Sequence, residues 1–151
     1  MAIGTDAFVE FYGTQDAIGT SSASVADAAF SIAGDLSTWT NDDDAPFAAI
    51  VFSGTFSVAP DANSVVELYV RMLNIVGTND EDIPDANNAA GFLGTFALND
   101  VTSAQYRQIL VKLPSGKTSA ELEFYIRNSG GQTLSAGWDI NVTPIAIGPH
   151  A

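Results

Sequence analysis

Apolar and polar residues alternate along much of the chain, and a period of two is typical of strands with one buried and one solvated face. The clearest cases are residues 65–75, 121–127 and 134–142. In the first of these, one face is formed by Val66, Leu68, Val70 and Met72. Because each segment has a polar face as well, the pattern favours antiparallel sheets.

Five further segments have the apolar and aromatic content of strands, and they are residues 7–12, 25–33, 47–58, 92–98 and 105–113. Residues 21–33 are rich in alanine and are also compatible with a helix, but their alternation favours a strand. About eight short strands separated by Gly, Pro, Asn and Asp turns predict an all-β fold, either a sandwich or a barrel. We expect a single-domain antiparallel β-sandwich over residues 1–151, jelly-roll-like in its topology.

The two ends of the chain lack this regularity. Residues 14–24 are rich in Gly, Ser, Thr and Ala without a clear period, so residues 1–24 are interpreted as a possible N-terminal arm. Residues 145–151 are interpreted as a short C-terminal tail, which holds the only histidine, His150. No basic segment precedes an apolar run at the start, so we expect no secretory signal.

Charge and cysteine content exclude several classes of function. Eighteen acidic and five basic side chains give a net charge of −13, which makes nucleic acid and anionic membranes improbable partners. No run of about 18 apolar residues is present to span a membrane. The absence of cysteine removes disulfides, thiolate metal sites and thiol nucleophiles.

No catalytic motif accompanies this composition. Serine hydrolysis needs a base, and the terminal His150 is a poor candidate for that role. Glu121 and Glu123 share a strand face, but beside Arg127 they are better explained as a solvated sheet surface than as a glycosidase pair. We therefore expect no enzyme and no cofactor.

The most distinctive polar segment is the acidic stretch of residues 78–88. Asp80, Asp82 and Asp85 supply the hard oxygen ligands that Ca²⁺ prefers, although Pro84 breaks the helix-loop-helix calcium pattern. A solvated loop and a partner-contact loop are the other interpretations, because long loops on rigid sandwiches often carry recognition. Residues 42–44 form a second acidic turn.

Aromatic residues suggest a further possibility, a glycan-binding platform. Tyr69 and Tyr125 lie on the outward faces of their predicted strands, and Trp39 and Tyr106 are additional candidates. Outward tyrosines are equally typical of cross-strand pairs and of contacts between subunits. Trp138 lies on an apolar face and is predicted to be in the core.

The apolar terminal segments are candidates for contact with a neighbouring subunit. Phe8, Phe11 and Tyr12 lie near the start, and Ile145 and Ile147 near the end. A positive mean hydropathy of +0.16 in so acidic a chain suggests that partners cover some apolar surface. The alternative is that both segments are edge strands of the same domain.

Residues 64–144 contain three distinctive motifs, which are Val66-Glu67-Leu68-Tyr69-Val70-Arg71-Met72, Leu122-Glu123-Phe124-Tyr125-Ile126-Arg127-Asn128 and Gly131-Gln132-Thr133-Leu134-Ser135-Ala136-Gly137-Trp138. These motifs resemble those of small virion structural proteins of tailed bacteriophages. These are strand and turn residues, so the resemblance brings no catalytic signature with it.

The resemblance implies a capsid decoration (cement) protein on the outer surface of the virion, made in the host cytoplasm. Its implied partners are the major capsid protein and further copies of itself, as a homotrimer. A tail- or head-fibre-associated module and a glycan-binding module displayed on the virion are the alternatives. Candidate partner contacts are Phe8, Phe11, Tyr12, Tyr69, Tyr125, Asp80, Asp82 and Asp85.

Overall fold

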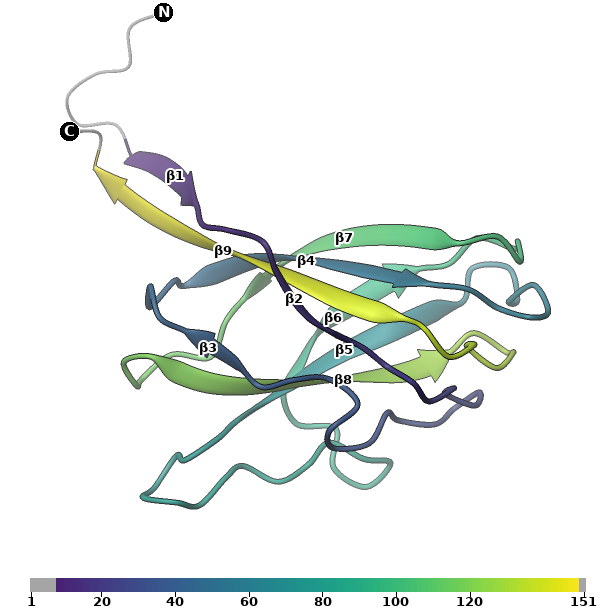
Figure 1. The fold of residues 1–151 in the computed structure, drawn as a ribbon, viewed down its shortest axis with the longest axis horizontal. Coiled ribbons are helices and arrows are strands. Elements are labelled where there is room, and N and C mark those ends of the chain that lie inside the picture. Colours follow the sequence, from purple (N-terminus) through teal and green to yellow (C-terminus); the bar gives the residue numbers. More distant parts are fainter. Residues whose placement is uncertain (1–7, 150–151) are drawn as a thin grey trace, which may run out of the picture.

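The computed structural model describes residues 8–149, which form nine strands in two antiparallel sheets packed as a sandwich (Figure 1). The predicted fold class is confirmed. The strands are β1 (Phe8–Tyr12), β2 (Asp16–Thr20), β3 (Trp39–Asn41), β4 (Phe47–Gly54), β5 (Val65–Met72), β6 (Phe92–Ala97), β7 (Gln105–Lys112), β8 (Ala120–Ser129) and β9 (Asp139–Pro149). Within residues 8–149, no helix reaches the length and hydropathy needed to cross a membrane.

The strand order is that of a jelly roll. One sheet runs β2-β9-β4-β7, with β1 also paired to β9, and the other runs β3-β8-β5-β6. The antiparallel pairs β2–β9, β3–β8, β4–β7 and β5–β6 are therefore nested, as if one long hairpin were rolled into two sheets. This nesting is the double Greek key of eight-stranded jelly rolls.

The core lies between the two sheets and is formed by the inward positions of the alternating strands. Ile50 and Phe52 of β4 and Ile140 of β9 are fully buried, and the Phe52 ring stacks on Phe96 of the opposite sheet at 5.4 Å between centroids. Trp138 is also fully buried and donates from Nε1 to the Ala23 carbonyl at 3.0 Å. Its predicted place in the core is confirmed.

The predicted strand at residues 25–33 is absent, and so is the alternative helix. The segment instead makes isolated bridges, from Phe30 to Arg127 at the edge of β8 and from Val25 to Leu134 in the β8–β9 loop. Ala28 has a φ of 60°, which turns the backbone away from the extended conformation and interrupts any regular ladder. Alternation in the sequence reflects burial of alternate side chains here without a continuous strand.

Two short strands and the bounds of the last strand differ from the prediction. Residues 16–20 form β2 and residues 39–41 form β3, neither of which was predicted. The last strand starts later than the alternation suggested and continues through Pro149, so most of the expected tail belongs to β9. Residues 1–7 of the expected arm, and residues 150–151 with His150, lie outside the described residues.

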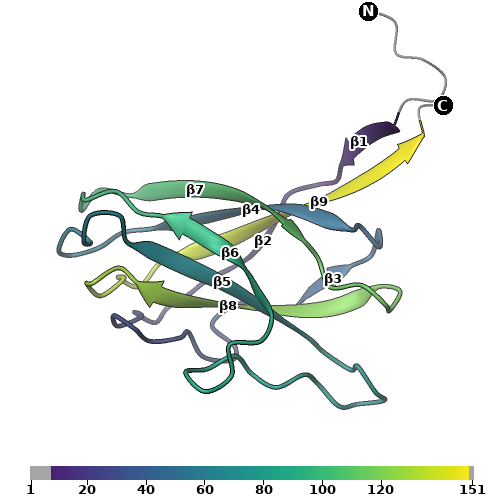
Figure 2. The same ribbon diagram turned by 180° about the vertical axis from the view of Figure 1, so that it is seen from behind.

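A two-stranded ribbon projects from one end of the sandwich, as Figures 1 and 2 both show. It consists of β1 and the last part of β9, from the pair Tyr12–Ile145 to the pair Phe8–Pro149. The neighbouring strand β4 stops pairing with β9 at Ile145, and β2 stops at Val142. Beyond the sandwich, therefore, β9 is paired with β1 alone.

Candidate docking surface

The outer face of the four-stranded sheet is charged and is covered by the chain itself. Arg71 lies opposite Glu123 and Glu67 lies opposite Arg127 across β5 and β8, and both pairs form ion pairs, at 2.6 and 3.2 Å. Phe30 packs on Tyr69 at 5.1 Å between ring centroids, from the segment that follows the edge of β8. This face is therefore closed by its own aromatic and polar contacts.

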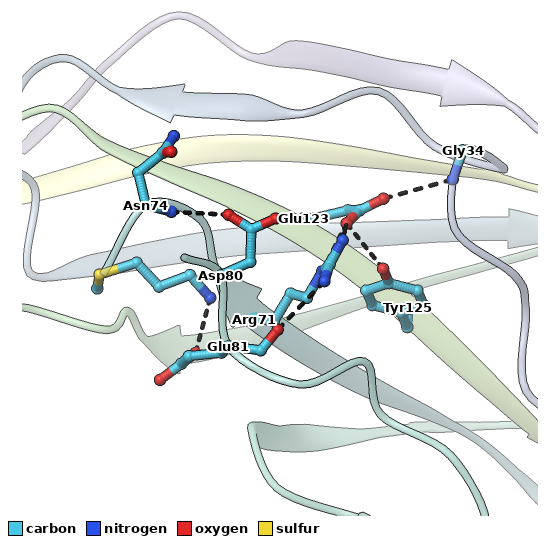
Figure 3. A network of polar contacts seen from close by, with 8 residues as sticks. Gly34, Arg71, Asn74, Asp80, Glu81, Glu123 and Tyr125 are labelled. Carbon is cyan, nitrogen blue, oxygen red and sulfur yellow. Dashed lines mark hydrogen bonds and ion pairs between the residues drawn. The ribbon is translucent and has the colours of Figure 1, made fainter. Parts of the chain in front are cut away.

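Glu123 is the centre of a polar network that links three parts of the chain (Figure 3). It accepts hydrogen bonds from Arg71 Nε at 2.7 Å, from the Tyr125 hydroxyl at 2.7 Å and from the Gly34 backbone amide at 3.3 Å. Arg71 also donates to the Glu81 carbonyl at 3.1 Å, and the Glu81 carboxylate accepts from the Met72 amide at 2.7 Å. The network thus fastens the acidic loop to the sheet.

Tyr69 and Tyr125 point outward from the sandwich core, as predicted, but they are not exposed. Their relative exposures are 4% and 0%. Burial and a hydrogen bond to Glu67 raise the pKa of Tyr69 to about 12, and burial and a hydrogen bond to Glu123 raise the pKa of Tyr125 above its usual value. Trp39 is buried as well, so of the four residues of the expected glycan platform only Tyr106 is exposed.

Two acidic side chains of the loop between β5 and β6 accept hydrogen bonds from backbone amides of the same loop. Asp80 accepts a hydrogen bond from the Asn74 amide at 2.9 Å, and Asp85 accepts from the amides of Asn87 and Asn88 at 2.7 and 2.8 Å. Asp80, Asp82 and Asp85 are exposed. Within residues 8–149, no group of three or more acidic or histidine side chains has the geometry to hold a metal ion.

The outer face of the five-stranded sheet has the opposite character. Its outward positions follow from the registers of β4, β7 and β9, in which Phe47 pairs with Lys112 and Ile145, and Ala49 with Leu110 and Thr143. Leu110 and Tyr106 of β7 are exposed by 69% and 68%. We call this surface the outer apolar face, formed by Phe47, Ala49, Val51, Ser53, Tyr106, Gln108, Leu110, Lys112, Asp139, Asn141, Thr143 and Ile145.

Charge is nearly absent from the outer apolar face, although the chain carries −13 overall. Lys112 at one end and Asp139 at the other are its charged residues. Asp139 accepts hydrogen bonds from the Ser53 hydroxyl at 2.8 Å and from Nδ2 of the Asn141 side chain at 3.2 Å. A surface that carries little charge and exposes large side chains such as Leu110 and Tyr106 in an acidic molecule is a candidate for docking.

A groove of about 340 Å³ lies where the outer apolar face meets the projecting ribbon. It is lined by Glu10, Phe47, Leu110, Val111, Lys112, Ile145 and Ile147. Most of these side chains are apolar, and the two charged ones have opposite signs. The groove therefore differs from the depressions near the acidic loop, which Asp80, Glu81 and Asp82 line.

The terminal candidates lie in the ribbon beside this groove. Phe11 and Tyr12 are exposed by 52% and 62%, and the backbone of Phe8 pairs with that of Pro149. The two terminal segments are strands that pair with each other and project from the sandwich. Sequence patterns did not reveal Phe47, Leu110 and Lys112, because only the registers of β4, β7 and β9 bring them together.

No protein-family model matches the chain, and no curated protein matches it. The chain is structurally similar to a chain in a structure of infectious bursal disease virus, Gx strain, with 12% identity and a TM-score of 0.30. The match covers 97% of this chain and 37% of the viral chain, so this chain spans well under half of that one. At this TM-score the likeness is weak and does not establish a relationship.

Proposed function

We propose that this protein is a non-enzymatic virion structural protein, a capsid decoration protein that binds the major capsid protein at the outer surface of a bacteriophage head. In this proposal it acts as a homotrimer and stabilises the head by burying surface across the capsid subunits beneath it. A protein that binds the assembled capsid, and does not bind the separate capsid subunits, stabilises the assembled state by mass action.

The observation that supports this proposal is the outer apolar face. A capsid contact needs a surface without strong negative charge, and the 18 acidic residues of the chain leave this face almost uncharged. Seven of the acids lie in two loops, three in the β3–β4 loop at residues 42–44 and four in the β5–β6 loop at residues 80–85. Acidic loops keep a displayed protein soluble and discourage particles from adhering to one another.

The fold is compatible with this role by analogy. Eight-stranded jelly rolls are common in viral capsid and lectin domains, although a fold by itself does not determine a function. The lectin alternative loses its main residues, because Tyr69, Tyr125 and Trp39 are buried. The tail- or fibre-associated alternative uses the same kind of docking face, so it is separated from the head proposal by where the protein binds.

The proposal is tested by rebinding the purified protein to capsids from which it has been removed. Wild-type protein should bind stoichiometrically to heads and raise their melting temperature. Tyr106→Asp, which places a charge on the outer apolar face, should abolish both effects. Ile32→Asp is the matched control, because Ile32 has nearly the same exposure, 69%, on a loop outside that face.

Each outcome separates the alternatives. Binding to isolated tails but not to heads would support the tail module and overturn the decoration protein. Heads that melt at the same temperature with and without bound protein would overturn the stabilising role. Equal binding by Tyr106→Asp and Ile32→Asp would show that the capsid contact lies on another face.

A further inference from the structure

Strand β7 is an edge strand that has no neighbour on its outer side among residues 8–149, and it runs along the border of the sandwich in Figures 1 and 2. Its eight residues pair with β4 without a register shift, from Lys112 to Gln105. The other edges are shorter or irregular: β1 and β3 have five and three residues, and the β2–β9 and β5–β6 ladders contain register shifts. Because proteins normally protect long, regular edges against pairing, the edge of β7 is suited to a further strand.

The hydrogen bonds between β4 and β7 determine which backbone groups of β7 are free. The Leu113 amide donates to the Pro46 carbonyl at 3.0 Å, so these two residues are a hydrogen-bonded pair at the end of the ladder. Such pairs occur at every second position of an antiparallel ladder, and the residues between them direct their N–H and C=O groups to the other side. The residues of β7 that face away from β4 are therefore Tyr106, Gln108, Leu110 and Lys112.

The open part of this edge is closed at both ends. At one end, Arg107 Nη1 donates to the Tyr106 carbonyl at 2.9 Å, and Arg107 Nε donates to the Ala97 carbonyl of β6 at 2.6 Å. At the other end, the next residue in the same series is Pro114, which has no N–H. The free edge therefore consists of three alternate residues with Leu110 at the centre, which are Gln108, Leu110 and Lys112.

The charge around β7 differs from that of the rest of the chain. Residues 86–120, which contain β6 and β7, hold three of the five basic residues and one of the 18 acidic ones, Asp100. Their net charge is therefore +2, and that of the remaining residues is −15. Two copies of a chain with a net charge of −13 repel each other, and the repulsion is smallest along the surface that holds the fewest acids. The charge distribution thus favours β7 for a contact between two copies.

We propose that the free edge of β7 pairs with the same edge of a second copy, antiparallel and about a two-fold axis at Leu110. An edge that is open over three alternate residues is complementary to itself about the central one, so the contact is isologous and closes with two copies. Leu110 then faces Leu110 of the second copy, and Gln108 faces Lys112 of the second copy. In this register every free N–H and C=O group of the three residues has a partner.

The side chains are compatible with this register. Leu110 is 69% exposed in the single chain, and a leucine pair across the axis covers part of both side chains. The Gln108 carbonyl oxygen can accept a hydrogen bond from the Lys112 ammonium, and the two lysines lie at opposite ends of the contact. Directly opposite side chains of an antiparallel pair lie on the same face, so the outer apolar faces of the two copies point in one direction. The β7 contact is additional to the three-fold association in the proposed function.

The β7 contact is tested in solution, without capsids, by sedimentation and light scattering over a range of protein concentrations. Wild-type protein should associate in pairs. Leu110→Asp and Leu110→Lys each place two like charges opposite each other at the axis, so each should raise the dissociation constant of the pair by roughly tenfold or more. Ile32→Asp is the matched control, because Ile32 is equally exposed, at 69%, and lies outside β7.

A mixture of the two charged variants tests the position of the axis. The introduced carboxylate of one copy then faces the introduced ammonium of the other. Leu110→Asp mixed with Leu110→Lys should therefore associate at a lower concentration than either variant alone, and Leu110→Asp mixed with Ile32→Lys should not. Failure of the first mixture to recover would overturn the pairing of Leu110 with Leu110.

A proline tests the backbone pairing. Gln108→Pro removes an N–H that faces away from β4, so it should leave the β4–β7 ladder in place and weaken the association of the copies. Thr95→Pro is the matched control on β6. The Leu98 amide donates to the Ser64 carbonyl at 3.0 Å, so by the same alternation the Thr95 N–H faces the open side of β6. Thermal unfolding of both variants checks that each is folded, and the Leu110 variants test the contact independently of the prolines.

The outcomes separate the β7 contact from the proposed function. A monomer or trimer whose mass is the same in the wild type and in Leu110→Asp would overturn the β7 contact and leave the decoration role standing. A hexamer that Leu110→Asp converts to trimers would support both, and a dimer that it converts to monomers would support the contact and overturn the homotrimer. A monomeric wild type whose binding to heads is lost in Gln108→Pro and kept in Thr95→Pro would show that β7 accepts a strand of the capsid, which would overturn the contact between copies.

Discussion

Arg71 and Glu123 lie directly opposite each other on β5 and β8, and their side chains form an ion pair of 2.6 Å under the acidic loop. Both side chains are largely buried, at 14% and 10% exposure. Arg71 also donates a hydrogen bond to the Glu81 carbonyl. One guanidinium therefore joins two strands to a loop that carries four acids between residues 80 and 85. Local repulsion among those acids is thereby offset by a cation beneath them.

Removal of this cation should destabilise the fold. Arg71→Ala leaves Glu123 buried without a counter-charge, and we expect a loss of about 2–3 kcal/mol in the free energy of unfolding, measured by urea denaturation. Arg127→Ala is the matched control on the same sheet face, because its ion pair with Glu67 is longer, at 3.2 Å, and the Arg127 side chain is 37% exposed. The control should lose about 1 kcal/mol or less. Equal losses in the two variants would contradict a special role for the Glu123 network.

Alkaline pH should destabilise the protein through its buried tyrosines. Burial and the hydrogen bond to Glu67 raise the pKa of Tyr69 to about 12, above its usual value near 10. Below pH 10 both the folded and the unfolded chain keep this proton, so the contribution to stability is fully present. Above about pH 10 the unfolded chain loses the proton first, and the contribution disappears as the pH rises through about 12.

The measurement is the urea midpoint at about pH 9 and about pH 11, for the wild type and for Tyr69→Phe. The wild-type midpoint should fall over this interval, and the variant should fall less because it has one ionising group fewer. The pKa of Tyr125 is also raised, so the midpoint of the Tyr69→Phe variant should still fall in part over the same pH interval. A variant whose midpoint falls as steeply as that of the wild type would contradict the assignment to Tyr69.

Gly91 should tolerate no side chain, because β6 begins where the chain passes very close to β5. The Val70 amide donates to the Gly91 carbonyl at 2.9 Å, and a Cβ at Gly91 would meet the Val70 carbonyl oxygen at 1.9 Å. Gly91→Ala should therefore lower the melting temperature strongly or displace the start of β6. Gly77→Ala is the control, since Gly77 has a similar positive φ of 65° but nothing within 4 Å of the built Cβ.

Thermal unfolding of the two variants isolates the close approach from the backbone strain. Both substitutions place alanine at positive φ, which costs about 1 kcal/mol. The loss of stability in Gly91→Ala should be clearly larger than this cost, and the loss in Gly77→Ala should not exceed it. Similar melting temperatures for the two variants would show that β6 shifts without cost to make room.

The length of the alternating segments decided which strands could be predicted from the sequence. The segments that became β5 and β8 alternate over seven residues, so their period was visible, whereas β7 was recognised from its apolar and aromatic content. The strand β3 has three residues, too few to show a period, and β2 contains a register shift between Ala17 and Thr20. Short and irregular strands are held by their neighbours, which a local pattern does not record.

Only part of the candidate docking surface could be predicted from the sequence. The outward orientation of Tyr69 and Tyr125 follows from alternation, but their burial depends on chain segments distant in sequence, including Phe30. Leu110 and Ile145 belong to one surface because β4 lies between β7 and β9, an order fixed by the jelly-roll topology. Phe11 and Tyr12 were recognised as candidates because an aromatic cluster near the start of the chain is visible in the sequence itself.

Asn128 shows most clearly how a residue that reads as a turn former can hold the core. It is fully buried; its amide nitrogen donates to the carbonyls of Val25 at 2.9 Å and Gln132 at 2.7 Å, and its side-chain oxygen accepts from the Gly130 amide at 3.0 Å. Asn128→Asp keeps the shape but sets a carboxylate against two carbonyl oxygens, in place of two donated hydrogen bonds. Because a buried charge without a counter-ion and two unpaired carbonyls are both costly, we expect a loss of about 3 kcal/mol or more in the free energy of unfolding, measured by urea denaturation at neutral pH.

The loss of stability in Asn128→Asp should shrink at acidic pH, where a protonated carboxyl regains one donor. Asn87→Asp, at an exposed loop position, should change stability by less than about 0.5 kcal/mol, and a comparable effect in the two variants would contradict the role of Asn128 as a buried clamp.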